Sequence, residues 1–499
     1  MKKLSVAKII GLILAVVQLI VSGIVSIQFL NMGFLPTKYW ALITGVLMLL
    51  FLIAFVLQFV NKIHWIGKII SVLMTAVLIF GLFYINQANQ ALKDISQRTV
   101  VEKNQILVVV KNDSPAKTID DLKDSSWGVQ YADDVELMGK AVDAVKEKLG
   151  TSLTLTAFDN YGALYPALMS GEIDAMILNS SYLDLIDELT AEEDGYYFSN
   201  EIRIIETLEF ETEKVAEEES TVREDFDITE DPFILYVSGI DTYGDISTRS
   251  RSDVNILMIA NPTTRQLLLL TTPRDAYVVI PGISGSQKDK LTHAGIYGVN
   301  KSIDTLNSIY DIDIDYYARV NFNSLINIVD ALGGVEVYSA NSFTSGSNLG
   351  ERFTYSQGYN HLNGKEALAF SRERYSLADG DNQRGRNQME VIKGIVNKVT
   401  SPAILTGFSG IMAEVSDQVQ TSVSTDDIYG LVKMQLEDPR SWEMFSFDTK
   451  ATGSREYCYS YSGKRLYVAN LHDSSIQQAK GLIETIMSGG TISEADVAQ

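Results

Sequence analysis

The first ninety residues contain three long apolar runs with almost no charge inside them. The runs are Ile9–Phe29 and Trp40–Val60, each of 21 residues, and Ile69–Ile85, of 17 residues. A helix of such length crosses a hydrocarbon layer of roughly 30 Å, and Lys68 beside the third run reaches the interface. Three runs are too many and too long for one cleaved signal peptide. We therefore predict three transmembrane helices within residues 1–92.

Basic residues near the ends of these runs predict their orientation in the membrane. Five lysines lie before the first run or between the second and third, whereas the loop between the first and second runs carries only Lys38. The five are Lys2, Lys3, Lys8, Lys62 and Lys68. Since lysine is enriched on the cytoplasmic side, we expect a cytoplasmic N-terminus and a large extracellular part that begins near residue 90.

Beyond a polar stretch at residues 86–104, interpreted as a stalk or a helix extension, strand patterns alternate with helical patterns. The predicted strands are Ile106–Val110, Trp127–Gln130, Leu153–Ala157 and Ala175–Leu178, and the predicted helices are Asp134–Leu149, Gly162–Ser170 and Ser181–Leu189. This order predicts a small accessory α/β domain over residues 100–210. Its segments 118–130 and 167–178 resemble one lobe of an extracellular solute-binding protein, and a spacer or interaction domain is the alternative.

Residues 211–231 hold ten acidic residues against Lys214 and Arg223, which predicts a solvated linker. Both patterns return in residues 232–490. The predicted strands there are Phe233–Ile240, Asn255–Ala260, Gln266–Thr272, Tyr316–Val320, Val335–Tyr338, Trp442–Phe447 and Arg465–Val468. The predicted helices are Val299–Ile309, Asn323–Leu332, Gly364–Phe370, Gln388–Val399, Thr425–Leu436 and Ser474–Met487. The expected fold class is α/β, with a mixed central sheet flanked by helices.

Charge and cysteine content narrow the possible functions of the exterior part. Six of the 41 basic residues and none of the 63 acidic residues precede residue 90, which leaves a balance of −28 for the rest of the chain. Such a field repels nucleic acid, so we expect no nucleic-acid partner. Cys458 is the only cysteine, so no disulfide can stabilise the chain internally, and we expect this thiol to pack in a core.

An arginine cluster at residues 370–390 stands out against this acidic background. It contains Arg372, Arg374, Arg384 and Arg386 in a stretch with two glycines, before the predicted helix that starts at Gln388. Guanidinium groups match phosphate oxygens two at a time and stay charged at any working pH. The cluster therefore indicates a phosphate-binding site, with a solvated surface loop as the simpler alternative.

Carboxylates and further basic residues follow the ends of predicted strands, where α/β proteins gather their sites. These residues are Asp241, Arg251, Asp253, Arg274, Asp275, Lys288 and Lys290. If the strands are neighbours, Asp241 and Asp253 converge beside Arg251 and Arg274. Two carboxylates with several arginines suit a diphosphate with bound Mg²⁺, since Mg²⁺ completes its shell with water and phosphate oxygens. Turn caps and surface ion pairs are the alternative for each residue taken alone.

Five motifs within residues 230–490 resemble the LytR-CpsA-Psr family. They are Ser-Gly-Ile-Asp-Thr-Tyr-Gly at 238–244, Ser-Arg-Ser-Asp-Val-Asn-Ile-Leu at 250–257, Thr-Pro-Arg-Asp-Ala-Tyr at 272–277, Asp-Lys-Leu-Thr-His-Ala-Gly at 289–295, and Arg-Glu-Arg-Tyr-Ser with Arg-Gly-Arg-Asn-Gln within 372–388. The three apolar runs and the accessory domain are similar to those of the capsule-locus members. The resemblance covers most of the chain after the acidic run.

The resemblance implies an extracellular, membrane-anchored, Mg²⁺-dependent phosphotransferase. It would move a glycopolymer, for this type capsular polysaccharide, from a polyprenyl diphosphate carrier to peptidoglycan and leave a phosphodiester. The implied Mg²⁺ ligands are Asp241 and Asp253, and the implied diphosphate-binding residues are Arg251, Arg274, Lys290, Arg372, Arg374, Arg384 and Gln388. The implied catalytic residues are Arg251, Arg274, Asp275, Arg372 and Arg374, and either Asp275 or a metal-bound aspartate would act on the acceptor hydroxyl.

The family's lipid chain occupies an apolar tunnel. Candidate lining residues are Leu291, Ile296, Leu306, Phe322, Leu325, Ile328 and Val329, each of which is also suited to an ordinary core. Pyrophosphatase activity on the lipid is a further implied reaction. The main alternative function is a sensor that binds lipid-linked intermediates and controls polymer export or chain length. A scaffold whose accessory domain recruits capsule polymerisation or export proteins is compatible with either.

Overall fold

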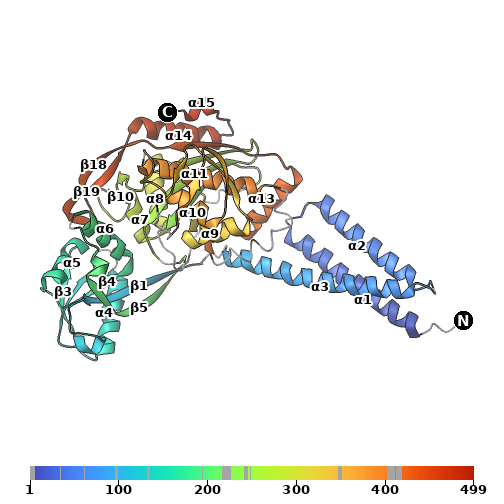
Figure 1. Cartoon of the computed structure of the whole chain (residues 1–499), viewed down its shortest axis with the longest axis horizontal. Coiled ribbons are helices and arrows are strands. Elements are labelled where there is room, and N and C mark those ends of the chain that lie inside the picture. Colours follow the sequence, from blue (N-terminus) through green and yellow to red (C-terminus); the bar gives the residue numbers. More distant parts are fainter. Residues whose placement is uncertain are drawn as a thin grey trace.

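The computed structural model describes residues 6–33, 35–60, 62–95, 99–131, 135–193, 195–215, 226–240, 246–247, 249–346, 351–378, 380–401, 411 and 418–498. Three N-terminal helices, α1 (Val6–Met32), α2 (Thr37–Leu57) and α3 (His64–Ile95), extend away from the rest of the chain (Figure 1). All three are long and apolar enough to cross a membrane. The predicted helices are confirmed, and α3 continues through residues 86–95, so half of the predicted stalk is helix.

The predicted accessory domain contains a five-stranded sheet in the order β3-β2-β4-β1-β5. Its strands are β1 (Thr99–Lys111), β2 (Ser126–Gln130), β3 (Thr154–Phe158), β4 (Ala175–Asn179) and β5 (Ile202–Val215). Its main helices are α4 (Val135–Leu149), α5 (Tyr161–Ser170) and α6 (Leu183–Glu193). The α/β class predicted for this region is confirmed, and β1 pairs along its whole length with β5.

Strand β5 is absent from the sequence-based prediction, which instead placed a linker from residue 211. Residues 211–215 form the end of this strand, and residues 216–225 lie outside the described residues. The sequence of β5 alternates apolar side chains such as Leu208 and Phe210 with acidic ones. Such alternation is typical of an edge strand with one wet face. The high density of acidic residues obscured that alternation.

The C-terminal domain is built on a six-stranded mixed sheet in the order β16-β11-β6-β7-β8-β17. Its strands are β6 (Phe233–Ile240), β7 (Ser252–Asn261), β8 (Gln266–Thr271), β11 (Tyr316–Val320), β16 (Val419–Thr421) and β17 (Glu443–Asp448). Strands β6, β7 and β8 are antiparallel neighbours, whereas β11 and β17 run parallel to β6 and β8. The predicted mixed central sheet is therefore confirmed.

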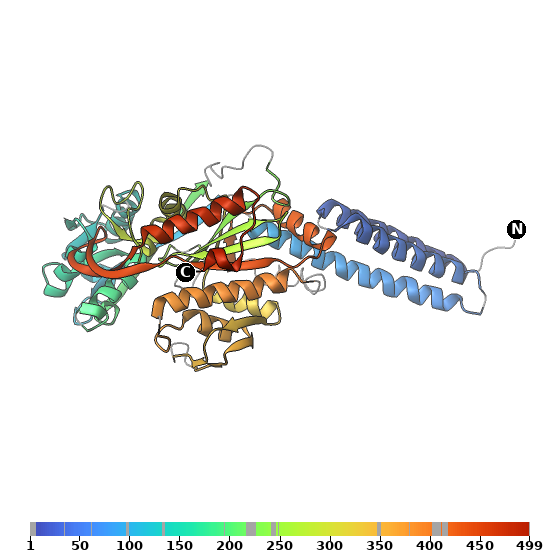
Figure 2. The same ribbon diagram turned by 90° about the horizontal axis from the view of Figure 1, so that it is seen from above.

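Helices cover both faces of this sheet (Figure 2). The helices are α7 (Leu291–Ala294), α8 (Val299–Tyr310), α9 (Phe322–Ala331), α10 (Gly364–Arg372), α11 (Gly380–Val399), α13 (Thr425–Glu437), α14 (Asp473–Met487) and α15 (Glu494–Val497). Side chains of α8 and α14 pack in one hydrophobic core, and Met389 of α11 and Leu431 of α13 pack in another. The prediction started α11 at Gln388, eight residues too late, so the second half of the arginine cluster is helical.

Four two-stranded ribbons complete the C-terminal domain. They are β9 (Tyr277–Val278) with β10 (Asp289–Lys290), β12 (Val335–Ser339) with β15 (Gly358–Leu362), β13 (Phe343–Thr344) with β14 (Thr354–Tyr355), and β18 (Ala451–Cys458) with β19 (Tyr461–Leu471). The β18–β19 ribbon reaches from the C-terminal domain to the accessory domain (Figure 1). Cys458 on this ribbon is buried, as expected for a packing residue, and burial raises the pKa of its thiol.

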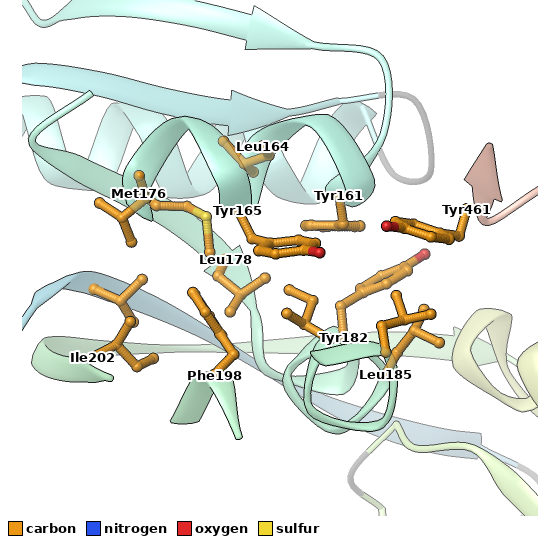
Figure 3. Close-up of a cluster of buried hydrophobic side chains, with 14 of the residues drawn as sticks. Tyr161, Leu164, Tyr165, Met176, Leu178, Tyr182, Leu185, Phe198, Ile202 and Tyr461 are labelled. Carbon is orange, nitrogen blue, oxygen red and sulfur yellow. The ribbon is translucent and has the colours of Figure 1, made fainter. Parts of the chain in front are cut away.

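The tip of this ribbon inserts into the core of the accessory domain (Figure 3). Tyr461 belongs to the same buried cluster as Tyr161 and Tyr182, whose rings stack at a centroid distance of 4.0 Å. A Cβ atom at Gly162 would lie 2.4 Å from the Tyr461 ring, so the start of α5 contacts the tyrosine directly. Because the contact is apolar and dry, it fixes the accessory domain against the ribbon.

A buried polar cluster binds the backbone of the ribbon tip at Ser460, next to Tyr461. Asp289 Oδ1 lies 2.6 Å from His293 Nδ1, and the Ser460 amide donates to Asp289 Oδ2 at 2.9 Å. Asp289 is fully buried, which by itself raises the carboxyl pKa. The His293 ring and the amides of Lys290 and Ser460 outweigh burial and lower the pKa of Asp289 below its ordinary value.

Replacing Asp289 by alanine is expected to lower the free energy of unfolding at pH 7 by about 3–5 kcal/mol, the usual cost of breaking a buried pair. A lowered folded-state pKa stabilises the protein above the unfolded-state pKa of about 3.9, and this stabilisation disappears as the pH falls through the folded-state value. Urea unfolding of the full chain in detergent should therefore show a smaller difference at pH 3 than at pH 7. Asp113→Ala, at an exposed carboxylate, is the control, and equal stability of both variants at pH 7 would contradict the assignment.

Candidate active site

Antiparallel pairing brings three segment ends to one edge of the central sheet. Ile240 at the end of β6 pairs with Ser252 at the start of β7, and the end of β8 lies beside the same part of β7. Asp253 and the Arg274–Asp275 pair therefore meet at this edge, as their positions after neighbouring strands predict. Asp241 directly follows β6, but it lies outside the described residues.

Ion pairs connect the residues at this edge. Arg274 Nη1 lies 2.6 Å from Asp253 Oδ2, and the Thr292 hydroxyl donates to Asp253 Oδ1 at 2.8 Å. Lys290 Nζ lies 3.2 Å from Asp275 Oδ1. The Thr292 amide also donates to the Arg274 carbonyl at 2.8 Å, so α7 is attached to the loop after β8. Arg274, Asp275 and Lys290 are all buried.

The charge on Asp253 is maintained by its surroundings. Burial favours the neutral carboxyl, but the guanidinium groups of Arg274, Arg251 and Arg384 and the Thr292 hydroxyl favour the carboxylate. Together they hold the pKa of Asp253 well below its usual range. Asp253 is therefore an ionised group inside a strongly positive environment at any working pH.

The end of α10 and the following turn position two further arginines. The Arg372 guanidinium carbon lies 4.1 Å from the Phe322 ring centroid, and that of Arg374 lies 4.6 Å from the Tyr375 ring centroid. Between them, Glu373 accepts hydrogen bonds from the amides of Tyr375, Ser376 and Gly346 at 2.8, 2.9 and 2.6 Å. Burial opposes ionisation of Glu373, but these amides lower the pKa of its carboxyl overall. The turn is therefore held by hydrogen bonds from backbone amides to the Glu373 carboxylate.

Helix α11 presents Arg384 and Gln388, which are one turn apart, to the same cavity. The Gln388 amide donates to the Ser371 carbonyl at 3.3 Å and so links α11 to α10. Arg386 does not line this cavity, because it lies on another side of the helix and pairs with Asp448 at 3.1 Å. The prediction of one cluster of four arginines was therefore wrong for Arg386. Arg384 and Arg386 point to different sides because they lie two positions apart on a helix and not in a loop.

These residues surround one cavity of about 1180 Å³. Its charged and polar end is lined by Arg251, Asp253, Arg274, Asp275, Lys290, Arg372, Arg374, Arg384 and Gln388. Its apolar part, between the sheet and helices α9 and α11, is lined by Leu235, Val237, Met258, Ala318, Val320, Phe322, Leu325, Ile328, Leu368, Val391, Ile392, Ile395, Val396 and Val419. Lys288 is not among the lining residues and instead lies 5.4 Å from the Tyr277 ring centroid.

Three of the predicted tunnel residues line the apolar part, and four do not. Phe322, Leu325 and Ile328 form one stripe of α9 that faces the cavity. The prediction was wrong for the other four, Leu291, Ile296, Leu306 and Val329, which are buried in hydrophobic cores outside the cavity lining. Leu291 and Leu306 belong to helices that contribute to a different core from the one lined by α11, and a one-residue step along α9 turns Val329 away.

A family comparison identifies the domain that holds this cavity. The model of the LytR_cpsA_psr family matches residues 198–475, which is more than half of the chain and includes every lining residue of the charged end. The chain belongs to the LytR-CpsA-Psr family. A second model, of a DNA polymerase processivity factor, matches residues 61–178. That range joins the apolar helix α3 to part of the accessory sheet and so does not correspond to one folded unit.

Curated relatives of this LytR-CpsA-Psr protein include two enzymes named polyisoprenyl-teichoic acid–peptidoglycan teichoic acid transferase TagU. The Bacillus licheniformis protein is 32% identical over 227 residues, which cover 45% of this chain and 70% of that protein. The Enterococcus faecalis protein is 36% identical over 200 residues, or 40% of this chain and 64% of that protein. The crystal structure of Bacillus subtilis TagU superposes with a TM-score of 0.40 and 26% identity, over 54% of this chain and 98% of that one.

Several residues of the LytR-CpsA-Psr cavity were not predicted from the sequence. Thr292, which binds Asp253, was quoted only as part of a motif, although a hydroxyl two residues from Lys290 was a usable signal. Asp187, Ala191 and Tyr197 of the accessory domain and Tyr467 of β19 also line the cavity. No sequence signal placed these four near the arginines, because their approach depends on how the accessory domain is attached.

The donor set for a Mg²⁺ ion is consistent with the chemistry that the sequence implies. Among the described residues, Asp253 Oδ1 accepts from Thr292 and Oδ2 from Arg274, and a carboxylate oxygen has two lone pairs. An ionised carboxylate in this position suits a cation, since Mg²⁺ is usually bound by one or two carboxylates together with water and phosphate oxygens. Within the described residues no group of three or more His, Cys, Asp or Glu side chains surrounds a metal position. The second predicted ligand, Asp241, is outside those residues.

Proposed function

We propose that this protein is a membrane-anchored phosphotransferase that moves a polyprenyl-diphosphate-linked glycopolymer to peptidoglycan. The observation that carries the proposal is one cavity with two parts, a basic end and a long apolar interior. A lipid diphosphate has the same two parts, and few soluble phosphates need an apolar interior of this size. The names of the TagU relatives, which act on polyisoprenyl-teichoic acid and peptidoglycan, support the same reaction class.

In the proposed reaction, the arginines position the diphosphate and stabilise charge that develops on its oxygens. An acceptor hydroxyl of peptidoglycan forms a bond to the phosphorus that carries the glycopolymer. The bond from this phosphorus to the bridging oxygen breaks, and polyprenyl monophosphate leaves. Asp275, which lines the cavity beside Lys290, would accept the hydroxyl proton. Such phosphoryl transfer depends mainly on positioning and electrostatics, which fixed guanidinium groups supply.

Three finer assignments belong to the same proposal. Mg²⁺ held by Asp241 and Asp253 would neutralise diphosphate charge. The three apolar helices would anchor the protein with a cytoplasmic N-terminus and an extracellular cavity, as the lysine distribution supports. The polymer would be capsular polysaccharide or, as for the named relatives, teichoic acid. Water in place of the acceptor would give the pyrophosphatase side reaction.

A sensor that only binds lipid-linked intermediates, with export or polymerisation proteins as partners, is the alternative, since binding alone needs the same cavity. A transfer assay in liposomes distinguishes the transferase from the sensor. Full-length protein in liposomes is given a radiolabelled polyprenyl diphosphate donor, Mg²⁺ and un-cross-linked peptidoglycan. A transferase releases polyprenyl monophosphate and labels the peptidoglycan. A sensor leaves the donor intact while binding it, and that result would overturn the proposed function.

In this assay Arg374→Ala is expected to slow transfer about 100-fold, the usual effect of removing one preorganised charge-stabilising donor. Arg374 lines the cavity and is held by a turn that its own side chain does not form. Arg440→Ala is the matched control, because Arg440 is an exposed arginine that pairs with Asp438 away from the cavity. Equal rates for the two variants, with equal melting temperatures, would remove Arg374 from the site.

A further inference from the structure

One face of the β18–β19 ribbon carries tyrosine and arginine side chains in alternation. Arg455 pairs with Tyr467 across the ribbon, and Tyr457 pairs with Arg465. Residues paired directly across an antiparallel ribbon lie on the same face, and all four of these side chains are exposed. The Arg465 guanidinium lies 5.4 Å from the Tyr457 ring centroid. On the opposite face Leu466 and Val468 are buried, whereas their partners Ser454 and Glu456 are half-buried, so the first face is the more exposed of the two.

The exposed face is firmly attached beside the reaction centre. The Ala469 amide, two residues after Tyr467, donates to the carbonyl of Asp275 at 2.8 Å. Further along, the Tyr277 hydroxyl donates to the Tyr457 carbonyl at 2.8 Å. The ribbon therefore has a fixed position relative to the charged end of the cavity. Tyr467 itself lines that cavity although its side chain remains 46% exposed.

The accessory domain contributes Tyr197 to the cavity wall that Tyr467 also lines. Tyr197 is 56% exposed and lines the cavity. The segment that carries it is held in place, because Asp187 accepts from the Ser199 amide at 2.7 Å and Thr190 accepts from the Phe198 amide at 3.1 Å. Phe198 is fully buried in the accessory core (Figure 3). A large exposed ring on so fixed a segment indicates a binding surface rather than a mobile loop.

We propose that Tyr197, Arg455, Tyr457, Arg465 and Tyr467, here named the tyrosine–arginine strip, bind the anionic glycopolymer of the donor where it leaves the diphosphate in the cavity. Tyrosine combines a flat apolar ring with a polar hydroxyl, which suits the C–H faces and hydroxyl edges of sugars. Arginine forks match the phosphate or carboxylate groups of an anionic glycan. This inference rests on the proposed function and adds its substrate-specificity element.

Continuity and charge identify the occupant as a glycan chain. Tyr467 belongs both to the strip and to the cavity that holds the proposed diphosphate. A glycopolymer attached to that diphosphate therefore leaves the cavity next to the strip. The part of the chain after residue 90 has a net charge of −28, so most of its surface repels an anionic polymer. A strip with two arginines gives such a polymer one favourable path.

The test measures binding of lipid-free glycans to the full-length protein in detergent by titration calorimetry. The probes are a teichoic acid oligomer of about six repeats, soluble un-cross-linked peptidoglycan strands, and neutral dextran of equal length. Tyr467→Ala and Tyr457→Ala are each expected to weaken binding of the teichoic acid oligomer about tenfold, a loss typical of an aromatic side chain at an interface centre. Tyr467→Phe should restore most of the affinity, since it keeps the ring.

The controls use a second exposed ribbon. Tyr359 on β15 is 77% exposed and contacts Tyr338 across its ribbon, but it does not line the cavity. Tyr359→Ala should therefore bind both anionic probes like the unchanged protein. A preference for the teichoic acid oligomer supports the strip as the donor's binding surface, and a preference for peptidoglycan strands would overturn that assignment. Equal loss in Tyr359→Ala and Tyr467→Ala, or equal binding of dextran, would overturn the proposal.

Failure of this inference is distinguishable from failure of the proposed function. If the liposome assay shows transfer but the strip variants bind both glycans normally, only the strip is wrong. If the protein binds glycans through the strip but never cleaves the donor, the strip stands and the transferase is wrong. Arg374→Ala should weaken binding of a sugar-free polyprenyl diphosphate more than Tyr457→Ala does, and a reversed order would also contradict the strip.

Discussion

Transfer of glycopolymer by Asp253→Asn is expected to be about 1000 times slower than by the unchanged protein, near the upper end of the effect of removing one preorganised electrostatic group. The Asp253 carboxylate binds Arg274 at 2.6 Å and is close enough to Arg251 and Arg384 for all three guanidiniums to lower its pKa. Asparagine keeps the size of the side chain but removes the negative charge that attracts these guanidinium groups and offsets the repulsion between them. Arg274 then loses its 2.6 Å ion pair and keeps the longer one, 3.7 Å from its Nε atom to Asp275 Oδ2.

The measurement is the initial rate of polymer transfer in liposomes, together with the melting temperature of each variant. Asp438→Asn is the matched control, because this aspartate also pairs with arginine but lies on the surface, away from the cavity. A Mg²⁺ titration separates two roles of Asp253. If the aspartate holds the cation, the variant needs more Mg²⁺, and if it only orients Arg274, the requirement stays the same. A folded variant with the normal rate would contradict both roles.

Filling the apolar part of the cavity is expected to weaken lipid binding by at least about 100-fold. Ala318 on β11 and Val396 on α11 line it from the sheet and the helix. The double variant Ala318→Trp with Val396→Trp places two large rings in open space, so the apolar lining is kept while lipid is excluded. At roughly 0.8 kcal/mol per buried methylene, excluding four carbons costs about 3 kcal/mol, or at least about 100-fold in affinity.

Binding of a fluorescent polyprenyl diphosphate in detergent measures this effect, and mass spectrometry of copurified lipid checks it independently. The matched control is the double variant Ala157→Trp with Val135→Trp, at two exposed positions of the accessory domain. Its affinity should equal that of the unchanged protein. Normal lipid binding by the cavity-filled variant, with an unchanged melting temperature, would place the lipid elsewhere.

Predictions from local patterns were most accurate where one short-range property decides the structure. Apolar length gave the three N-terminal helices, and short continuous apolar runs gave β6, β7 and β8 within a few residues. Residue chemistry also selected the charged end of the cavity, since Arg251, Asp253, Arg274 and Lys290 lie together there. Their catalytic roles remain predictions. Local rules failed for β5, whose acidic wet face concealed an edge strand.

The residues that the sequence misplaced share a different cause. Arg386 has the same chemistry as Arg384, but two positions along a helix turn it toward Asp448. Val329 and Ile328 are both apolar, yet only Ile328 faces the cavity. In each case the sequence predicted the chemical character of the side chain correctly, but it did not predict toward which surface the side chain points. Direction depends on the helix start and on the surfaces that pack around the helix.

The sequence by itself determined the three apolar helices, the mixed α/β class and the basic, phosphate-suited chemistry of the charged cavity end, because each follows from local composition and spacing. Only the tertiary structure decided which apolar side chains line the cavity and which fill the core. It also brought Tyr197 of the accessory domain and Tyr467 of the ribbon to the cavity wall. These positions depend on packing between segments hundreds of residues apart, as at Tyr461 and Tyr161, and local patterns carry no information about such contacts.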